Sequence, residues 1–130
     1  MAYAINKTDG TVVATVADGT LDTTSSSLSL IGKNYAGYGE VLNENQIKIL
    51  ENFANTSSNT PTSPLQGQVW YNTTANQLQV YNGSSFKSVS GANVSASEPT
   101  NTAQGDLWYD STNGQLYVYS GSAFVLVGPA

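Results

Sequence analysis

The stretch that decides the fold is Gln66-Gly-Gln-Val-Trp-Tyr-Asn-Thr-Thr-Ala-Asn-Gln-Leu-Gln-Val-Tyr-Asn-Gly-Ser-Ser-Phe-Lys-Ser-Val89, because the chain repeats it. The second copy, 38 residues later, is Gln104-Gly-Asp-Leu-Trp-Tyr-Asp-Ser-Thr-Asn-Gly-Gln-Leu-Tyr-Val-Tyr-Ser-Gly-Ser-Ala-Phe-Val-Leu-Val127. Thirteen of the 24 aligned residues are identical, and the alignment needs no gap. Repetition at a fixed period indicates that both copies form the same supersecondary unit.

Each copy has the pattern of a three-stranded antiparallel β-meander. In the first copy, Val69-Trp70-Tyr71 and the alternating segment Gln77–Tyr81 predict two strands, joined by the polar turn Asn72–Asn76. Asn82-Gly83 predicts a two-residue hairpin turn, and Ser85–Val89 closes the unit. The same positions in the second copy are Leu107–Tyr109, Leu116–Tyr119, Ser120-Gly121 and Ala123–Val127.

The alternation also predicts a packed face in each unit. The residues expected on this face are Leu78, Val80, Leu116 and Val118, packed under Trp70 or Trp108. A unit of about 24 residues buries too little surface to be stable alone, and the chain has no cysteine to staple it. We therefore expect the repeats to pack on each other, on the N-terminal part or on other chains.

The segment before the repeats has a different composition. Tyr3–Lys7 and Val12–Val16 are β-branched runs around a turn, which predicts a hairpin, and Leu28–Ile31 predicts a further strand. One helix is predicted over Glu44–Ala54.

The predicted helix has three mutually consistent signals. Asn43 is expected as its N-cap with Gln46 at N3, and Leu42 and Ile47 are placed to form a hydrophobic staple. The side chains expected on its apolar attachment and packing face are Ile47, Leu50, Phe53 and Ala54.

The fold class predicted from these patterns is mainly β with one α-helix. An N-terminal β-plus-helix module over residues 1–55 is followed by two small antiparallel β-meander repeats, at 66–89 and 104–130. Residues 56–65, which contain Pro61 and Pro64, are predicted as a linker, and residues 90–103 as a spacer.

The composition excludes several classes of function. The chain has no His, no Cys and only four basic residues against nine acidic ones, which gives a net charge of −5. Histidine-dependent triads, thiolate chemistry and His/Cys metal sites are therefore absent, and no basic patch is available for nucleic acid. No 18-residue apolar stretch predicts membrane insertion, and no signal peptide is expected, so synthesis in a cytoplasm is predicted. We expect no enzyme activity, no catalytic residue and no cofactor.

Two acidic motifs could suggest catalysis or calcium binding, but each has a simpler structural interpretation. Asp106 and Asp110 flank a strand, but the first repeat has Gln68 and Asn72 at these positions, which favours surface positions over a catalytic pair. The segment Asp18-Gly19-Thr20-Leu21-Asp22 has oxygen ligands suited to calcium, but too few for a full site, so a plain turn is favoured and no metal is predicted.

Aromatic residues offer one binding hypothesis. Trp70, Trp108, Tyr117 and Tyr119 are the residues expected to contact a glycan, since sugar faces stack on aromatic rings. The favoured interpretation is that these rings form the core and the cross-strand pairs that strands prefer.

Several segments together resemble modules of virion structural proteins of tailed bacteriophages, of the tail-fibre-like and baseplate-associated type found in marine T4-like phages. The segments that carry the resemblance are Ala4–Thr11, Asp18–Thr20, Gly32–Glu40, Leu42–Asn45 and Leu50–Ala54, with the Gly-X-Leu/Val-Trp-Tyr…Leu-X-Val-Tyr units from Pro64 to Phe86 and from Gly105 to Phe124. The resemblance covers nearly the whole chain. Fibre proteins of this type often run to many hundreds of residues, so a short appendage or adaptor is expected.

The resemblance implies a non-enzymatic component of the virion, a short tail-fibre or baseplate-associated adaptor that binds other virion proteins. The alternatives are a capsid decoration protein or head fibre, and a glycan-binding module that recognises the host surface. Homo-oligomerisation, with a trimer favoured as in many fibres, would supply the burial that each small unit lacks.

Overall fold

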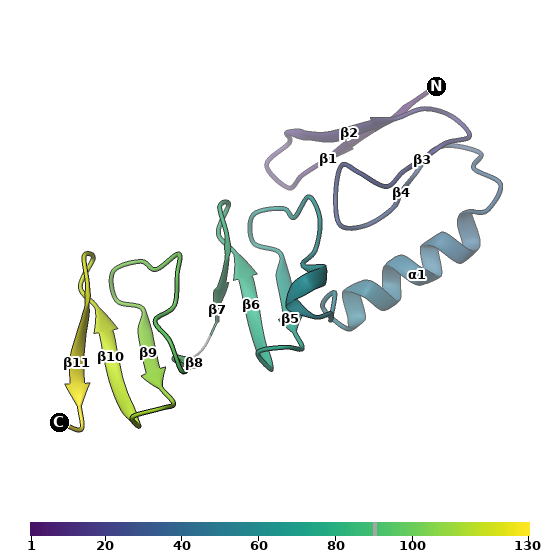
Figure 1. Ribbon diagram of the computed structural model, residues 1–130. Coiled ribbons are helices and arrows are strands. Elements are labelled where there is room, and N and C mark those ends of the chain that lie inside the picture. Colours follow the sequence, from purple (N-terminus) through teal and green to yellow (C-terminus); the bar gives the residue numbers. More distant parts are fainter. Residues whose placement is uncertain (90) are drawn as a thin grey trace.

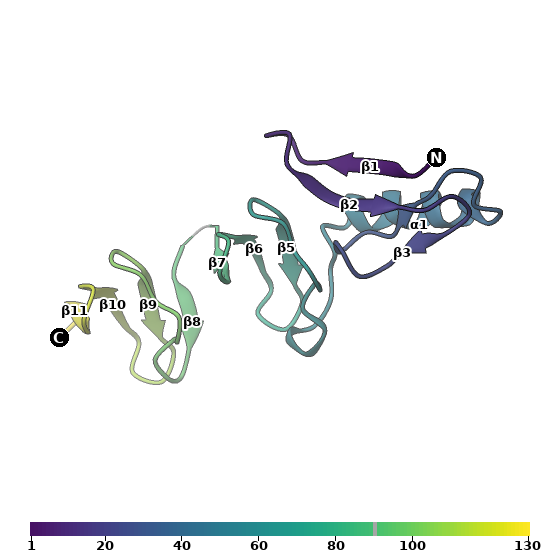
Figure 2. The same cartoon turned by 90° about the horizontal axis from the view of Figure 1, so that it is seen from above.

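The computed structural model describes residues 1–89 and 91–130, and Ser90, the first residue of the predicted spacer, lies outside the described residues. Figure 1 shows three parts in a row: the N-terminal module at one end, the first repeat in the middle and the second repeat at the C-terminal end. Seen from above, the two repeat sheets stand one behind the other along the chain (Figure 2).

The strands of the described residues form four small sheets, and two helical segments lie outside them. The helices are α1 (Tyr38–Leu50) and the 3-10 turn η1 (Ser57–Asn59). The strands are β1 (Tyr3–Asn6), β2 (Val12–Val16), β3 (Leu21–Asp22), β4 (Leu30–Ile31), β5 (Val69–Asn72), β6 (Gln77–Tyr81), β7 (Phe86–Ser88), β8 (Asn93–Ser95), β9 (Leu107–Asp110), β10 (Gln115–Tyr119) and β11 (Phe124–Gly128). The sheet orders are β1-β2, β3-β4, β5-β6-β7 and β11-β10-β9-β8. The predicted fold class, mainly β with one α-helix, is confirmed.

The N-terminal module contains the predicted hairpin. β1 and β2 pair antiparallel, with Tyr3 opposite Val16, and Asp9 caps the turn by accepting hydrogen bonds from the N–H and hydroxyl of Thr11. The predicted strand Leu28–Ile31 is shorter than expected, because only Leu30–Ile31 pairs, with β3.

The predicted helix boundaries are wrong at both ends. α1 begins at Tyr38, so Asn43 lies inside the helix and cannot be its N-cap, and the staple of Leu42 and Ile47 does not form at a helix start. The cap position is Gly37, without a side-chain hydrogen bond.

One tertiary contact holds the middle of the helix, and a local cap marks its C-terminal end. Asn45 accepts a hydrogen bond from the Ser29 N–H and donates one to the Ser29 carbonyl, which attaches the helix beside β4. At the other end Asn52 and Phe53 adopt left-handed φ values of 51° and 56°, and the Phe53 N–H donates to the Lys48 carbonyl, as at a helix C-terminus. Phe53 therefore leaves the helix face on which it was expected.

The two repeats share one fold, as predicted. β5-β6-β7 and β9-β10-β11 are antiparallel meanders in which Trp70 pairs with Gln79 and Trp108 pairs with Tyr117. Both tryptophans are buried, at 3% and 6% exposed, and each packs edge-on against the phenylalanine of the third strand, with ring centroids 5.0 and 5.3 Å apart. The ungapped sequence register therefore does preserve both backbones.

Equivalent hydrogen bonds close both units. The Gly67 N–H donates to the Tyr81 carbonyl, and the Gly105 N–H donates to the Tyr119 carbonyl, each over 2.8 Å. Both glycines have a left-handed φ, 91° and 94°, which a side chain would strain. The hairpin turn lies one residue later than predicted, since the Asn82 N–H bonds the Ser85 carbonyl and Gly83 and Ser84 are the central residues.

The predicted packed face is wrong. Leu78 pairs with Tyr71, while Trp70 pairs with Gln79, so Leu78 and Val80 lie on the face opposite to Trp70. The second repeat shows the same arrangement, with Leu116 opposite Tyr109. Because strand side chains alternate between faces, residues on adjacent strands share a face only when they are register partners or lie an even number of positions from the partner. The tryptophan face is instead completed by aromatic rings.

Each repeat also includes a parallel partner that precedes its first strand. β8 pairs parallel with β9, and in the first repeat Asn55 forms a parallel bridge to Asn72. The Thr73 N–H donates to the Asn55 carbonyl as the Ser111 N–H donates to the Ser95 carbonyl. The structural unit thus begins before the segment in which the sequence repeat is visible.

Gly32 allows two loops of the N-terminal module to approach each other. Its N–H donates to the Thr20 carbonyl, and a Cβ atom there would press on the carbonyl oxygens of Ala17 and Thr20. We expect Gly32→Ala to destabilise the protein by about 1–3 kcal/mol, measured by urea unfolding. The control is Gly39→Ala in α1, where a Cβ meets nothing within 4 Å and the substitution should instead stabilise by about 0.5–1 kcal/mol. Equal effects of the two substitutions would contradict this account.

Candidate functional site

The two carboxylates of the acidic segment 18–22, for which a plain turn was favoured over a calcium site, both have partners within the chain. Asp18 forms an ion pair with the N-terminal amine of Met1. Asp22 accepts hydrogen bonds from the Ser25 hydroxyl and from the backbone N–H groups of Thr24 and Ser25, and these bonds lower its pKa to about 2. Across residues 1–89 and 91–130, no group of three or more His, Cys, Asp or Glu side chains could hold a metal ion.

The prediction that Asp106 and Asp110 are both surface positions is wrong for Asp110, which is 4% exposed. Its Oδ1 accepts hydrogen bonds from the N–H groups of Thr112 and Asn113, and Asn72 holds the equivalent turn of the first repeat in the same way. A carboxylate and an amide oxygen can make the same bonds, so the Asp/Asn exchange marks a buried turn anchor. Asp106 has a separate partner, Lys87.

Of the four residues expected to contact a glycan, the two tryptophans are buried and the two tyrosines are partly exposed. Trp70 and Trp108 are buried and offer no open ring face to a sugar. Tyr117 stacks on Trp108 with ring centroids 4.8 Å apart, and its hydroxyl donates to Gln115. Tyr119 packs edge-on against Phe124.

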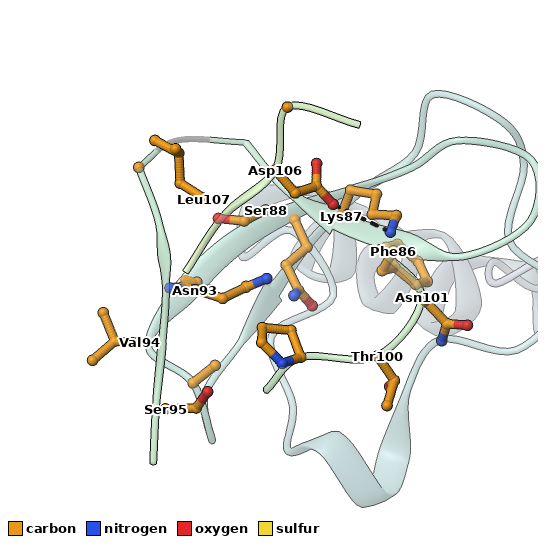
Figure 3. Close-up of a pocket in the computed structure, with 16 residues that line it drawn as sticks. Phe86, Lys87, Ser88, Asn93, Val94, Ser95, Thr100, Asn101, Asp106 and Leu107 are labelled. Atoms are coloured by element: carbon orange, nitrogen blue, oxygen red, sulfur yellow. Dashed lines mark ion pairs between the residues drawn. The ribbon is translucent and has the colours of Figure 1, made fainter. Parts of the chain in front are cut away.

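A cleft of about 460 Å³ lies between the two repeats. One side of the cleft is formed by β6 and β7. The other side is formed by β8 and by residues 99–101 and 105–107, which lead into β9. Figure 3 shows Lys87 reaching across it to Asp106, with the Nζ and Oδ2 atoms 3.6 Å apart. The Gln77 amide also donates to the Ala92 carbonyl over 3.2 Å. The cleft is therefore the junction that sets one repeat against the next.

This ion pair was not predicted, although the sequence contains a pattern that points to it. Lys87 corresponds to Val125 in the other repeat, and Asp106 corresponds to Gln68, so each charge occurs at a position where the repeats differ. The structure shows that these two departures from the repeat are partners of each other. Two opposite charges, each present in only one of the repeats, therefore indicated a contact between the repeats here.

Several exposed apolar side chains of the N-terminal module lie along α1, which contains no buried residue. The α1 surface, as we define it, consists of Tyr38, Leu42 and Ile49, which are 61%, 44% and 54% exposed. At 100° per residue, these three side chains form one stripe about 40° wide. Leu50 and Ile47 are also exposed, but they lie further round the helix, with Gln46 between Leu42 and Leu50 and with Glu40 and Glu44 beside Ile47. An exposed apolar stripe along a helix is typical of a protein interaction surface.

The predicted attachment and packing face is thus only partly as expected. Ile47 and Leu50 lie on the helix and are exposed, whereas Phe53 lies beyond the helix and is partly buried. Leu50, at 79% exposed, packs against little of its own chain. Within the chain, α1 is held chiefly by the polar contact of Asn45 with Ser29.

The accessible surface of the molecule is large for its mass. It measures 8080 Å², whereas a compact monomer of 13.7 kDa exposes roughly 6600 Å². The buried apolar residues of the described chain are Ala14, Val16, Trp70 and Trp108. So small a core leaves much of the apolar surface open for contacts with other molecules.

Comparisons with known proteins return no match: no family model, no curated protein and no solved structure is similar to the chain. None of the helices formed by the described residues is long and apolar enough to cross a membrane. The functional interpretation therefore depends on the surfaces described above and on the resemblance noted in the sequence.

Leu50 tests whether α1 is held by its own chain. We expect Leu50→Ala to change the free energy of unfolding by no more than about 0.5 kcal/mol, because the side chain is already exposed. The comparison is Trp70→Ala, which should cost about 3–5 kcal/mol through loss of a buried ring. Urea unfolding of both variants checks this, and a loss of 2 kcal/mol or more for Leu50→Ala would show that the helix is packed.

Asp110 is expected to make the stability of the fold depend on pH in the acidic range. The Asn113 amide, followed by the N–H groups of Thr112 and Asn113, lowers the pKa of Asp110 below its ordinary value of 3.8 against the opposing effect of burial. A carboxyl group with a lowered pKa in the folded state contributes stability above about pH 4 and loses it as the pH falls through the folded value.

We expect Asp110→Asn to be less stable than wild type at pH 7 but to lose less stability between pH 5 and pH 2. Asp9 and Asp22, whose pKa values are also lowered, account for the acid dependence that remains. Thermal unfolding across this pH range is the measurement. Identical pH profiles for the variant and the wild type would exclude Asp110 as a source of the acid dependence.

Proposed function

We propose that the chain is a non-enzymatic structural component of a bacteriophage virion, a short tail-fibre or baseplate-associated adaptor. The observation that carries this proposal is the α1 surface, a helix side with no partner in the described chain. The resemblance of the sequence to phage virion modules supplies the class of assembly. Its partners are other virion proteins, and we propose the virion as its location.

The N-terminal module is the part suited to attachment. The α1 surface gives a partner a stripe of three exposed apolar side chains, and Glu40 and Glu44 lie on the other side of the helix from this stripe. Burial of exposed leucine and isoleucine side chains contributes about 25 cal/mol per Å². The partner that fits is a protein with an apolar groove for one helix.

The repeats suit a projecting role. Each is a small sheet whose tryptophan face is covered by its own aromatic rings. The ion pair and the hydrogen bond across the cleft hold the two sheets next to each other. The small core favours self-association, and we propose a homo-oligomer, with a trimer as the state implied by the resemblance. A capsid decoration protein or head fibre would have the same surfaces, so the location on the particle separates these alternatives.

The test is incorporation into particles of the phage that encodes the chain. We expect Ile49→Lys to reduce the copy number in purified particles at least ten-fold, since it places a charge at the centre of the α1 surface. The matched control is Glu44→Gln, which changes the net charge by the same amount at an exposed position on the other side of the same helix. Quantitative mass spectrometry gives the copy number, and electron cryo-microscopy locates the wild-type chain on tail, baseplate or capsid.

The outcomes separate the possibilities. Absence of the wild-type chain from purified particles contradicts the proposed function. Equal incorporation of both variants shows that α1 is not the attachment surface. Density on the capsid in place of the tail would establish the head-fibre or decoration alternative.

A further inference from the structure

The chain contains two Asn-Gly steps, Asn82-Gly83 in the first repeat and Asn113-Gly114 in the second, and both asparagines are exposed. Figure 1 shows the turn between β6 and β7, which holds the first step, and the turn between β9 and β10, which holds the second, at opposite ends of their sheets. An Asn-Gly step is where a main-chain nitrogen most easily attacks the preceding side-chain amide, because glycine has no Cβ to obstruct the approach. The sequence therefore makes both steps candidates for this reaction, and their surroundings distinguish them.

The attacking nitrogen is free at one step and bonded at the other. Among the described residues, none accepts a hydrogen bond from the Gly83 N–H, and Gly83 is exposed. The Gly114 N–H donates to the Asp110 carbonyl over 2.8 Å, and Gly114 is only partly exposed. A hydrogen-bonded N–H must open before its nitrogen can lose a proton to solvent and attack. The fold thus protects the Asn113 step and leaves the Asn82 step open.

The side-chain amides are also held through different atoms. Asn82 Oδ1 accepts hydrogen bonds from the N–H groups of Ser84 and Ser85, over 2.8 and 2.9 Å. Attack on Cγ gives this oxygen a negative charge, so two N–H donors already directed at it stabilise the intermediate. Asn113 is held instead through Nδ2, which donates to the Asp110 carboxylate over 2.8 Å, and no described residue donates to its Oδ1.

The second repeat shows that the hairpin turn does not need an amide at the position of Asn82. Ser120 occupies the equivalent place, and its Oγ accepts hydrogen bonds from the N–H groups of Ser122 and Ala123, over 3.4 and 3.2 Å. Its own N–H donates to the Ala123 carbonyl, as the Asn82 N–H donates to the Ser85 carbonyl. A serine therefore holds the same turn without an amide that can be lost.

We propose that Asn82 is a site of spontaneous self-modification. Its side-chain amide is converted to a carboxylate with water as the co-reactant, while the fold protects Asn113 from the same reaction. The site is independent of the proposed function, since it depends only on the hairpin turn of the first repeat.

The reaction has two steps. The Gly83 nitrogen gives its proton to a base in the solvent and forms a bond to Asn82 Cγ, and the Cγ–Nδ2 bond then breaks, so that Nδ2 leaves as ammonia after taking up a proton. Water next opens the resulting succinimide ring, at the side-chain carbonyl to give aspartate or at the main-chain carbonyl to give isoaspartate. In total one water is consumed and one ammonia is released, and nothing is oxidised or reduced.

The two products affect the first repeat differently. The aspartate product keeps the accepting oxygen, since an acid and an amide serve equivalent turns at Asp110 and Asn72, and it adds one negative charge to an acidic chain. The isoaspartate product lengthens the main chain inside the turn that sets the register of β6 with β7, and with it the contact of Trp70 with Phe86. We therefore expect the isoaspartate form to unfold at a lower urea concentration than the aspartate form.

The test is to age the folded full-length protein in mildly alkaline buffer. Tandem mass spectrometry of proteolytic peptides follows both steps, because replacement of NH₂ by OH raises the mass. We expect the Asn82 amide to be lost about ten-fold faster than that of Asn113, since the hydrogen bond of Gly114 must open first. The control is the same experiment in concentrated urea, where both steps lie in unfolded chain and should react at similar rates.

The variant Asn82→Ser is matched to the second repeat, which has serine at the equivalent position. It should abolish the reaction at this step and leave the rate at Asn113 unchanged. The deciding comparison is made within the wild-type chain, so it does not require the variant to fold.

Each outcome decides the proposal. A faster loss at Asn82 that disappears in urea supports it. Equal rates in the folded protein, or a faster loss at Asn113, overturn it. A difference that persists in urea also overturns it, because the flanking residues and not the fold would then select the site. None of these results bears on whether the chain is incorporated into particles, so the proposed function is tested separately.

Discussion

The packing of one tryptophan on one phenylalanine holds each repeat together, because it joins the first strand of the sheet to the third across the middle strand. Trp70 meets Phe86, and Trp108 meets Phe124, at nearly the same distance and angle. The contact exists only if both turns keep their length and the register of both strand pairs is maintained. Asn72 and Asp110 hold the first turn of each unit, and the left-handed glycines Gly67 and Gly105 bring the chain into the first strand. Trp, Phe and the glycine that leads into the first strand, which this contact needs, are identical in the two copies.

Burial on one face has consequences for the rest of the molecule. A three-stranded sheet that closes its aromatic face with its own rings leaves its second face half exposed, and the short N-terminal sheets cannot cover α1 as well. The accessible surface of 8080 Å² includes these uncovered faces. A chain of this kind gains stability by assembly, since the apolar area that it cannot bury internally can be buried against other chains. The proposed role as an assembling component would meet that requirement.

The repeats share one Trp–Phe contact and differ at other positions, and one pair of differences reports on neighbours. Lys87 and Asp106 introduce charge where one repeat meets the next, and they satisfy each other across the cleft. Val125 stands in place of Lys87 in the second repeat. Because the two repeats share a fold, a comparison of their equivalent residues shows which substitutions go with a different neighbour. The same logic explains why an amide in one copy and a carboxylate in the other can serve one buried turn.

The sequence by itself determined the elements whose information is local or repeated. The N-terminal hairpin, the three strands of each repeat and the equivalence of the two tryptophans follow from alternation, turn residues and an ungapped period, because these patterns constrain the backbone directly. Tertiary structure decided how α1 is attached, since Asn45 inside the helix bonds Ser29, and the capping signal at Asn43 lies within the helix and not at its start. It also decided that Leu78 lies on the face opposite to Trp70, because face sharing between strands depends on register between separate segments and not on alternation within one. The cleft and the ion pair across it formed only when distant segments came together, as contacts between units depend on their packing and not on the pattern within either unit.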